Sequence, residues 1–123
     1  MNSLRILLVD DNPIFLEAAA HFLSRQPWME IVGRAKTGLE AIRLVEQLSP
    51  ALVVMDMAMP QMNGLEATRR IKSQIAPPRV IIVTLDYDAQ CRADARDVGA
   101  DGFINKLECT ESILPLITKL FAS

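Results

Sequence analysis

The sequence lacks the features that mark several common protein classes. It carries only two cysteines, Cys91 and Cys109, and their spacing forms no CxxC motif. A disulfide scaffold or thiolate metal site is therefore not expected, and the two thiols are most simply reduced structural groups. The single histidine, His21, has no second ligand candidate nearby. We interpret it as structural or solvated.

Long apolar runs and an excess of basic residues are also missing. No apolar run approaches the roughly 20 residues that cross a bilayer. The amino terminus passes from a short apolar run directly into acids, without the cleavage site of a signal peptide. Lys and Arg number 13 against 15 Asp and Glu, a net charge of −2. Because nucleic acids and anionic membranes attract basic surfaces, we expect neither as a direct partner. Without an expected membrane span or signal peptide, we expect a cytoplasmic location.

What the sequence does contain is a regular alternation of apolar runs and amphipathic stretches. Its 123 residues, 50% of them hydrophobic, suffice for one domain with one core. The apolar runs are continuous rather than alternating, which is typical of strands covered on both faces in a parallel sheet. They predict five strands, over residues 5–9, 29–33, 51–55, 79–83 and 102–105.

Helical patterns fill the gaps between these runs. The first helix has a clear start, with Asn12 as its cap and Pro13 at the first helical position. The fourth, roughly 88–98, is unusually polar, so we expect it to be mobile or ordered only against a partner. In the last helix Pro115 would remove a backbone hydrogen bond. That helix either starts later than its apolar pattern suggests or bends.

This alternation predicts an α/β fold, a doubly wound three-layer (βα)5 sandwich. The expected sheet is five-stranded and parallel, of order 2-1-3-4-5, as in flavodoxin-like folds. No linker, repeat or low-complexity stretch interrupts the chain, so we expect a single domain over 1–123. In such sheets ligands bind beyond the carboxyl ends of the strands, at the switch point between the first and third strands.

Polar side chains stand at that edge of the predicted sheet. Asp10 and Asp11 follow the first strand, Asp56 follows the third, Thr84 ends the fourth and Lys106 follows the fifth. Three carboxylates so close together repel one another unless a cation joins them. Lys106 supplies one positive charge, and Mg2+ suits the rest because it binds a few carboxylates, keeps several waters and usually works beside phosphate.

This set of groups predicts a phosphoacceptor site. A carboxylate beside Mg2+ and a lysine can attack phosphorus and form an acyl phosphate. Phosphoryl transfer then requires mainly positioning and charge neutralisation on three equatorial oxygens. Mg2+, Lys106 and the Thr84 hydroxyl can each take one oxygen, with Asp56 as the acceptor.

Four segments carry a family resemblance: "LLVDDN", "VVMDMAMPQMNG", "VIIVTLD" and "GADGFINK". In this order they resemble the signature segments of the response-regulator receiver domain of two-component signalling, which has the CheY-like fold. The resemblance covers essentially the whole chain. The stretch "MEIVGRAKTGLEAI" further resembles receivers of helix-turn-helix transcriptional regulators of the NarL/FixJ/LuxR type.

The resemblance implies a role for each site residue. Asp56 would be phosphorylated by a sensor histidine kinase, or by a small acyl phosphate in vitro, and Lys106 would contact the phosphoryl group. Asp11, Asp56 and the backbone carbonyl of Ala58 would bind Mg2+ directly, and Asp10 would bind it through water.

The resemblance also implies a switch and an output. Thr84 and Phe103 would form the switch pair, with the hydroxyl moving toward the phosphate and the ring rotating inward. The output would be a changed surface for a downstream protein or output domain, or a homodimer. The chain either stands alone or is the amino-terminal domain of a transcription regulator whose DNA-binding domain is absent, and the branch resemblance favours the second. Catalysis would be limited to its own phosphorylation and slow autodephosphorylation.

Parts of the sequence also bear on other functions. Leu85 and Leu107 depart from the family, which usually has a small residue and often a proline at these positions, so a phosphate-independent pseudo-receiver acting as an interaction module stays open. We expect a trans bond before Leu107. A phosphohydrolase would carry a second aspartate where this chain has Ala58, and no phosphate-binding Gly- or Ser/Thr-rich loop supports a flavin site.

Overall fold

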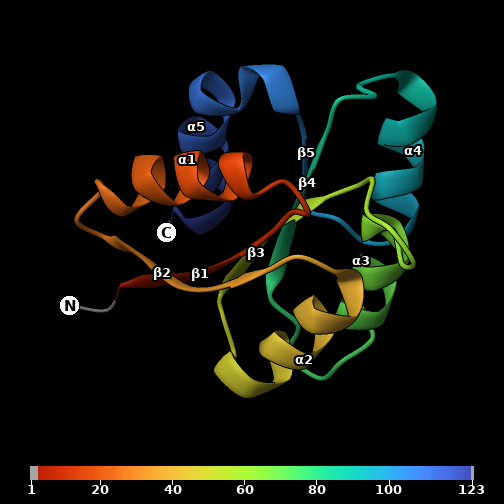
Figure 1. Ribbon diagram of the computed structural model, residues 1–123, viewed down its shortest axis with the longest axis horizontal. Coiled ribbons are helices and arrows are strands. Elements are labelled where there is room, and N and C mark those ends of the chain that lie inside the picture. The colour runs from red at the N-terminus through yellow and green to blue at the C-terminus, as the bar shows by residue number, and fades with distance from the viewer. Residues whose placement is uncertain (1–2, 123) are drawn as a thin grey trace.

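A computed structural model of the chain describes residues 3–122 and contains one parallel sheet of order β2-β1-β3-β4-β5 (Figure 1). The predicted fold class and strand order are confirmed. The strands are β1 (Leu4–Val9), β2 (Met29–Ala35), β3 (Leu52–Asp56), β4 (Arg79–Thr84) and β5 (Gly102–Asn105). The helices are α1 (Pro13–Ser24), α2 (Gly38–Leu48), α3 (Gly64–Lys72), α4 (Ala89–Asp97) and α5 (Cys109–Phe121), with a short 3-10 turn η1 (Lys106–Glu108).

Helices cover both faces of the sheet. Helices α1 and α5 lie on one face, and α2, α3 and α4 lie on the other (Figure 1). Successive residues of one strand therefore enter opposite cores: Ile6 of β1 packs toward α1 and α5, and Leu7 packs toward α2 and α3. All of β3 is buried. This two-sided burial explains why the strand sequences are continuously apolar.

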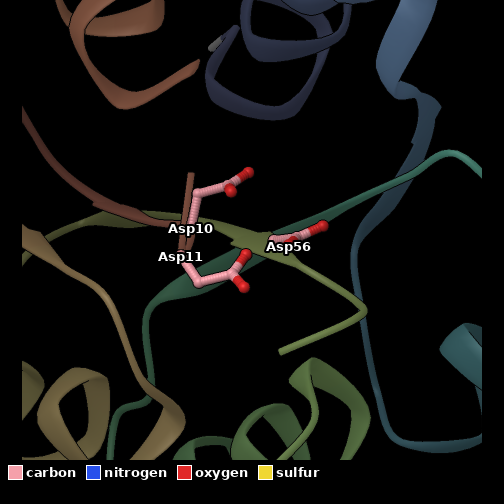
Figure 2. Close-up of side chains that lie close together, drawn as sticks. All are labelled: Asp10, Asp11 and Asp56. Carbon is pink, nitrogen blue, oxygen red and sulfur yellow. The ribbon is translucent and has the colours of Figure 1, made fainter. Parts of the chain in front are cut away.

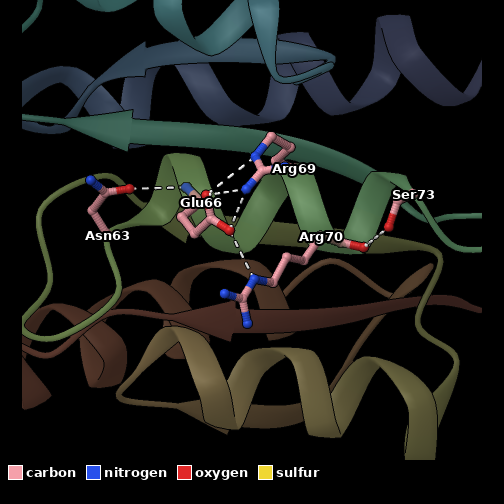
Figure 3. Close-up of polar contacts among 5 residues, drawn as sticks. All are labelled: Asn63, Glu66, Arg69, Arg70 and Ser73. Carbon is pink, nitrogen blue, oxygen red and sulfur yellow. Dashed lines mark hydrogen bonds and ion pairs between the residues drawn. The ribbon is translucent and has the colours of Figure 1, made fainter.

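Side-chain caps set where the helices begin. Asn12 accepts a hydrogen bond from the Ile14 N–H at 2.9 Å, and Pro13 occupies the first turn of α1, as predicted. Asn63 caps α3 by accepting from the Glu66 N–H at 2.9 Å (Figure 3). The Glu66 carboxylate in turn pairs with Arg69 at 2.6 Å and with Arg70 at 2.8 Å. This network fixes the start of α3, directly after the loop that leaves β3.

Several local predictions are refined by the structure. The fourth helix forms over Ala89–Asp97 with Ala95 as its buried residue, and its mobility stays a prediction. Helix α5 begins at Cys109 and runs through Pro115, so the alternative that it starts later than its apolar pattern suggests is wrong. The described residues contain no cis peptide bond, which confirms the trans bond before Leu107. None of the described helices is long and apolar enough to cross a membrane.

Candidate functional site

Asp56 is the last residue of β3, so this strand ends one position later than the predicted range 51–55. The N–H of the next residue, Met57, donates to the Val83 carbonyl at 3.0 Å, so pairing with β4 continues past the apolar run. The Asp56 residue is only 5% exposed, although its carboxylate lies at the open edge of the sheet. The central strand thus holds one acid at a fixed position beyond its end.

The loop after Asp56 closes through a glycine. The Gly64 N–H donates to the Met57 carbonyl at 2.7 Å. A Cβ atom at position 64 would lie 2.1 Å from the Asp56 carbonyl oxygen, far inside van der Waals contact. Only a residue without a side chain lets the start of α3 approach the end of β3 this closely.

Three carboxylates converge at this edge. Asp10 and Asp11 follow β1, which lies beside β3, and each offers an oxygen within 4.8 Å of one from Asp56 (Figure 2). Asp10 is 1% exposed, whereas Asp11 is open to solvent. The predicted convergence of these acids is confirmed. An all-oxygen donor set with one open side suits a hard divalent cation that keeps some of its waters.

Lys106, the first residue after β5, reaches this group of acids. Its Nζ lies 2.8 Å from Asp10 Oδ2 and 3.7 Å from Asp56 Oδ1, and its side chain is 13% exposed. The turn η1 fixes the backbone here, because the Asn105 side chain accepts from the Leu107 N–H at 3.0 Å. The lysine therefore faces two of the three carboxylates, as its position after the strand predicted.

Asp10 differs from the other two acids in its partners. Its Oδ1 accepts from the Asn12 N–H at 2.8 Å, and its Oδ2 faces Lys106. One oxygen thus takes part in a hydrogen bond and the other in an ion pair. Asp10 ties the end of β1 to the start of α1 and anchors the lysine.

Electrostatics raise the pKa of the Asp56 carboxyl to about 6 from its ordinary 3.8. Burial is the largest cause, and the charge of Asp10, with a smaller contribution from Asp11, acts in the same direction. Lys106 and the backbone amide of Ala58 oppose the rise. A carboxylate with a raised pKa is destabilised as an anion, so a cation bound here would relieve the repulsion.

The two predicted switch residues occupy different environments. Thr84 ends β4, is 2% exposed, and its Oγ1 accepts from the Asp86 N–H at 3.0 Å. Phe103 of β5 is half-buried and stacks on Tyr87, with ring centroids 5.1 Å apart and planes 15° from parallel. The guanidinium of Arg92, from α4, lies 4.9 Å from the Tyr87 centroid and 5.7 Å from the Phe103 centroid.

The sequence analysis did not identify two residues of this stack, Tyr87 and Arg92. Arg92 also donates to the Tyr87 hydroxyl at 2.6 Å. The sequence does hold one signal, because Tyr87 is the single tyrosine of the chain and follows the predicted switch threonine by three positions. The arginine carries no comparable signal, since it meets the rings only through the packing of α4.

The remaining predicted residues lie at the rim. Ala58 is exposed in the loop between β3 and α3, so the role of its carbonyl stays a prediction. Leu85 and Leu107 are 63% and 79% exposed. The two hydrophobic departures from the family pattern are therefore presented to solvent at the edge that holds the carboxylates.

Comparison with known proteins agrees with this geometry. Residues 6–118 match the sequence model of a family described as the response regulator receiver domain. The chain is 39% identical over 104 residues to protein-glutamate methylesterase/protein-glutamine glutaminase 4 of Myxococcus xanthus, covering 84% of this chain and 30% of that protein. It is 35% identical over 103 residues to the transcriptional regulatory protein LiaR of Bacillus subtilis, covering 84% and 49%.

A solved structure is similar over nearly the whole chain. It is a two-component response regulator of the LuxR family from Aurantimonas sp. SI85-9A1, with 32% identity and a TM-score of 0.92. The match covers 98% of this chain and 86% of that one. The chain spans less than half the length of the two curated relatives, at 30% and 49%.

Proposed function

This chain belongs to the response regulator receiver family, and from that premise we propose that it is a switch controlled by phosphorylation of Asp56 by a sensor histidine kinase. One observation supports this proposal above the others. A nearly buried carboxylate at the end of the central strand has a lysine ammonium 3.7 Å away and two further carboxylates around it. That combination supplies a nucleophile, a fixed positive charge and a place for a metal ion.

The acids divide the metal-binding work. Asp11 and Asp56, with the backbone carbonyl of Ala58, would hold Mg2+ directly. Asp10 would act through water, since it is nearly buried and its carboxylate accepts from the Asn12 N–H and pairs with Lys106. The bound ion supplies charge neutralisation for the phosphoryl oxygens.

The chain's own residues carry the transfer. An Asp56 carboxylate oxygen forms a bond to phosphorus as the phosphorus–nitrogen bond of the kinase's phosphohistidine breaks, and the imidazole nitrogen keeps the electron pair. Lys106 stabilises one equatorial oxygen of the transferred group. The Thr84 hydroxyl accepts from the Asp86 N–H, which leaves its own proton free to donate to another. Turnover is limited to this transfer and to slow hydrolysis of the acyl phosphate.

The switch follows from movement of Thr84. When the hydroxyl approaches the phosphoryl group, the space it leaves beside β5 admits the ring of Phe103. An inward turn of this ring separates it from Tyr87 and changes the surface formed by α4 and β5. Phosphorylation thereby biases a two-state equilibrium that a downstream protein, an output domain or a second copy reads.

The output is proposed to be transcription. The likeness to LiaR supports this, as does the likeness to a LuxR-family regulator. Residues 1–123 then form the single receiver domain of a longer protein whose other part binds DNA. The relative named as a methylesterase supports a different output, in which the same switch controls another activity.

The deciding experiment measures intact-protein mass after incubation with acetyl phosphate and Mg2+. We expect a gain of one phosphoryl group in the wild type and in Asp97→Ala, which removes an exposed acid at the end of α4. Asp56→Ala and chelation by EDTA should each abolish the gain. Circular dichroism of Asp56→Ala checks that the variant is folded.

Two results would overturn the proposal. Labelling that persists in Asp56→Ala would place the acceptor elsewhere. An unlabelled wild type, under conditions in which a known receiver is labelled, would favour the phosphate-independent interaction module.

A further inference from the structure

The ammonium group of Lys106 has a third neighbour besides its two carboxylates. Its Nζ lies 4.6 Å from the centroid of the Phe15 ring, over the ring face. Asp10 and Asp56 approach the ammonium with their negative carboxylates. The π face of Phe15 covers another side of the ammonium, at a distance typical of cation–π contacts.

The ring is held there by the same residues that organise the acid site. Asp10 accepts from the Asn12 N–H at 2.8 Å, and Asn12 caps α1 by accepting from the Ile14 N–H at 2.9 Å. Phe15 follows on this first turn. Its partly buried ring packs into the core between α1 and α5. The acid that pairs with the lysine thus also fixes the helix that presents the ring.

A cavity lies behind the ring. Its volume is about 220 Å³, and aromatic and aliphatic side chains from α1 and α5 form most of its wall. Phe15, Phe22 and Lys106 all contribute to the lining. A lysine has a flexible four-carbon stem, so an aromatic ring at this position limits the volume that the ammonium can explore.

We propose that Phe15 is a positioning residue for phosphoryl transfer: its ring holds the Lys106 ammonium against Asp10 and toward Asp56. This inference rests on the proposed function, because it gives the lysine its task at the phosphoryl group. The ring does not touch the phosphoryl group. It acts by keeping the ammonium within reach of the oxygen that the lysine neutralises.

The test uses Phe15→Leu and two matched variants. Phe15→Leu keeps an apolar side chain but removes the π face. Phe15→Tyr keeps the face and serves as the rescue. Phe22→Leu makes the same truncation in the wall of the same cavity, without a ring over the ammonium.

The first readout is structural and needs no phosphorylation. In protein with 13C-labelled lysine, the Cε protons of Lys106 should show a ring-current shift to high field, with the signal assigned by its loss in Lys106→Arg. Phe15→Leu should remove this shift, whereas Phe15→Tyr and Phe22→Leu should keep it. A Lys106 signal that is the same in wild type and Phe15→Leu would overturn the proposal.

The second readout is the rate of labelling by acetyl phosphate at saturating Mg2+. Phe15→Leu should lower this rate by roughly 2- to 30-fold, the range that cation–π contacts span. Phe15→Tyr should stay within about 2-fold of wild type on the same reasoning, because the ring face is retained. In a Lys106→Ala background, Phe15→Leu should cause no further loss, because the two residues act as one unit.

Equal rate losses in Phe15→Leu and Phe22→Leu would show a merely structural role and overturn the proposal. So would a full additional loss in the Lys106→Ala background. If the wild type itself is not labelled, the proposed function fails, and the Lys106 ring-current shift still decides whether Phe15 positions the ammonium.

Discussion

The rings of Tyr87 and Phe103 stack face to face, with centroids 5.1 Å apart and planes 15° from parallel. The contact joins the loop after β4 to the middle of β5. Because Tyr87 is only three residues from Thr84, a movement of the threonine is transmitted to the stack through a very short stretch of chain. The stack therefore holds the Phe103 ring in its present position and, in the proposed switch, would oppose an inward turn of this ring.

Removal of the guanidinium over this stack should ease the switch. Arg92→Ala loses a cation–π contact with each ring and the hydrogen bond to the Tyr87 hydroxyl. At an exposed site these contacts together are worth about 1 kcal/mol, a factor of roughly five in an equilibrium. We expect Arg92→Ala to bind the phosphoryl mimic beryllofluoride about five-fold more tightly, as measured by titration in Mg2+.

Arg96→Ala is the matched control, since it removes the same charge from the same helix and has no contact over the two rings. Its affinity for beryllofluoride should equal that of the wild type. Unchanged or weaker binding by Arg92→Ala would show that the stack does not oppose activation.

Gly64→Ala should be strongly destabilising. The new Cβ would lie 2.1 Å from the Asp56 carbonyl oxygen, which belongs to the backbone of the central strand and cannot yield. Overpacking usually costs about 1–3 kcal/mol, and a clash with buried backbone should reach about 3 kcal/mol or more. Urea unfolding monitored by circular dichroism measures this loss.

Gly33→Ala provides the comparison for that variant. There the added Cβ meets the tip of the Leu48 side chain at 2.9 Å, which can rotate away. Its loss of stability should therefore be clearly smaller. Equal losses in the two variants would mean that α3 can move away from Asp56, contrary to the close packing argued above.

The fold and the acid cluster could be predicted from the sequence because both follow from regular rules. Continuous apolar runs such as 80–83 are typical of strands buried on two faces, and parallel strands bring their carboxyl ends to one edge. The position of Asp10, Asp56 and Lys106 after such runs was therefore enough to place them together. Even here the predicted end of the third strand was one residue too early, because Asp56 still pairs with Val83 beyond the apolar residues.

The contacts of Phe15 and Arg92 could not be predicted in the same way. Both side chains belong to helices and reach the site across a packed interface, so their roles depend on helix position to within a few ångströms. Their sequence patterns are those of ordinary helices: Phe15 fits the apolar face of α1, and Arg92 fits a polar surface. Three-dimensional packing alone shows that each lies over a residue of the proposed machinery.

Metal binding should stabilise the folded chain through the acid cluster. Mg2+ at 100 times its dissociation constant should raise the free energy of unfolding by about 2.7 kcal/mol. In Asp11→Asn one direct ligand loses its charge, so the same Mg2+ concentration should give a much smaller increase. Urea unfolding at several Mg2+ concentrations tests this, with Asp97→Asn as a control for loss of an exposed acid. Equal stabilisation of Asp11→Asn and wild type would place the metal elsewhere.

Asp56 should make the stability of the metal-free protein depend on pH. Because its pKa in the folded state is raised to about 6 from 3.8, folding favours the protonated form. That contribution is complete below about pH 3.8 and is lost as the pH rises through about 6, where the buried anion forms beside Asp10 and Asp11. Asp56→Asn removes this ionisation and leaves the other groups in place.

The variant should therefore be more stable than wild type at pH 8 in EDTA, and its advantage should shrink as the pH falls toward 4. Urea unfolding of both proteins across this range measures the difference, in which titrations common to both cancel. Addition of Mg2+ at pH 8 should narrow the gap, because the cation stabilises the Asp56 anion that the variant lacks. A difference that does not change with pH would mean that Asp56 ionises in the folded protein as easily as in the unfolded chain, and that burial and its acidic neighbours are fully offset by Lys106.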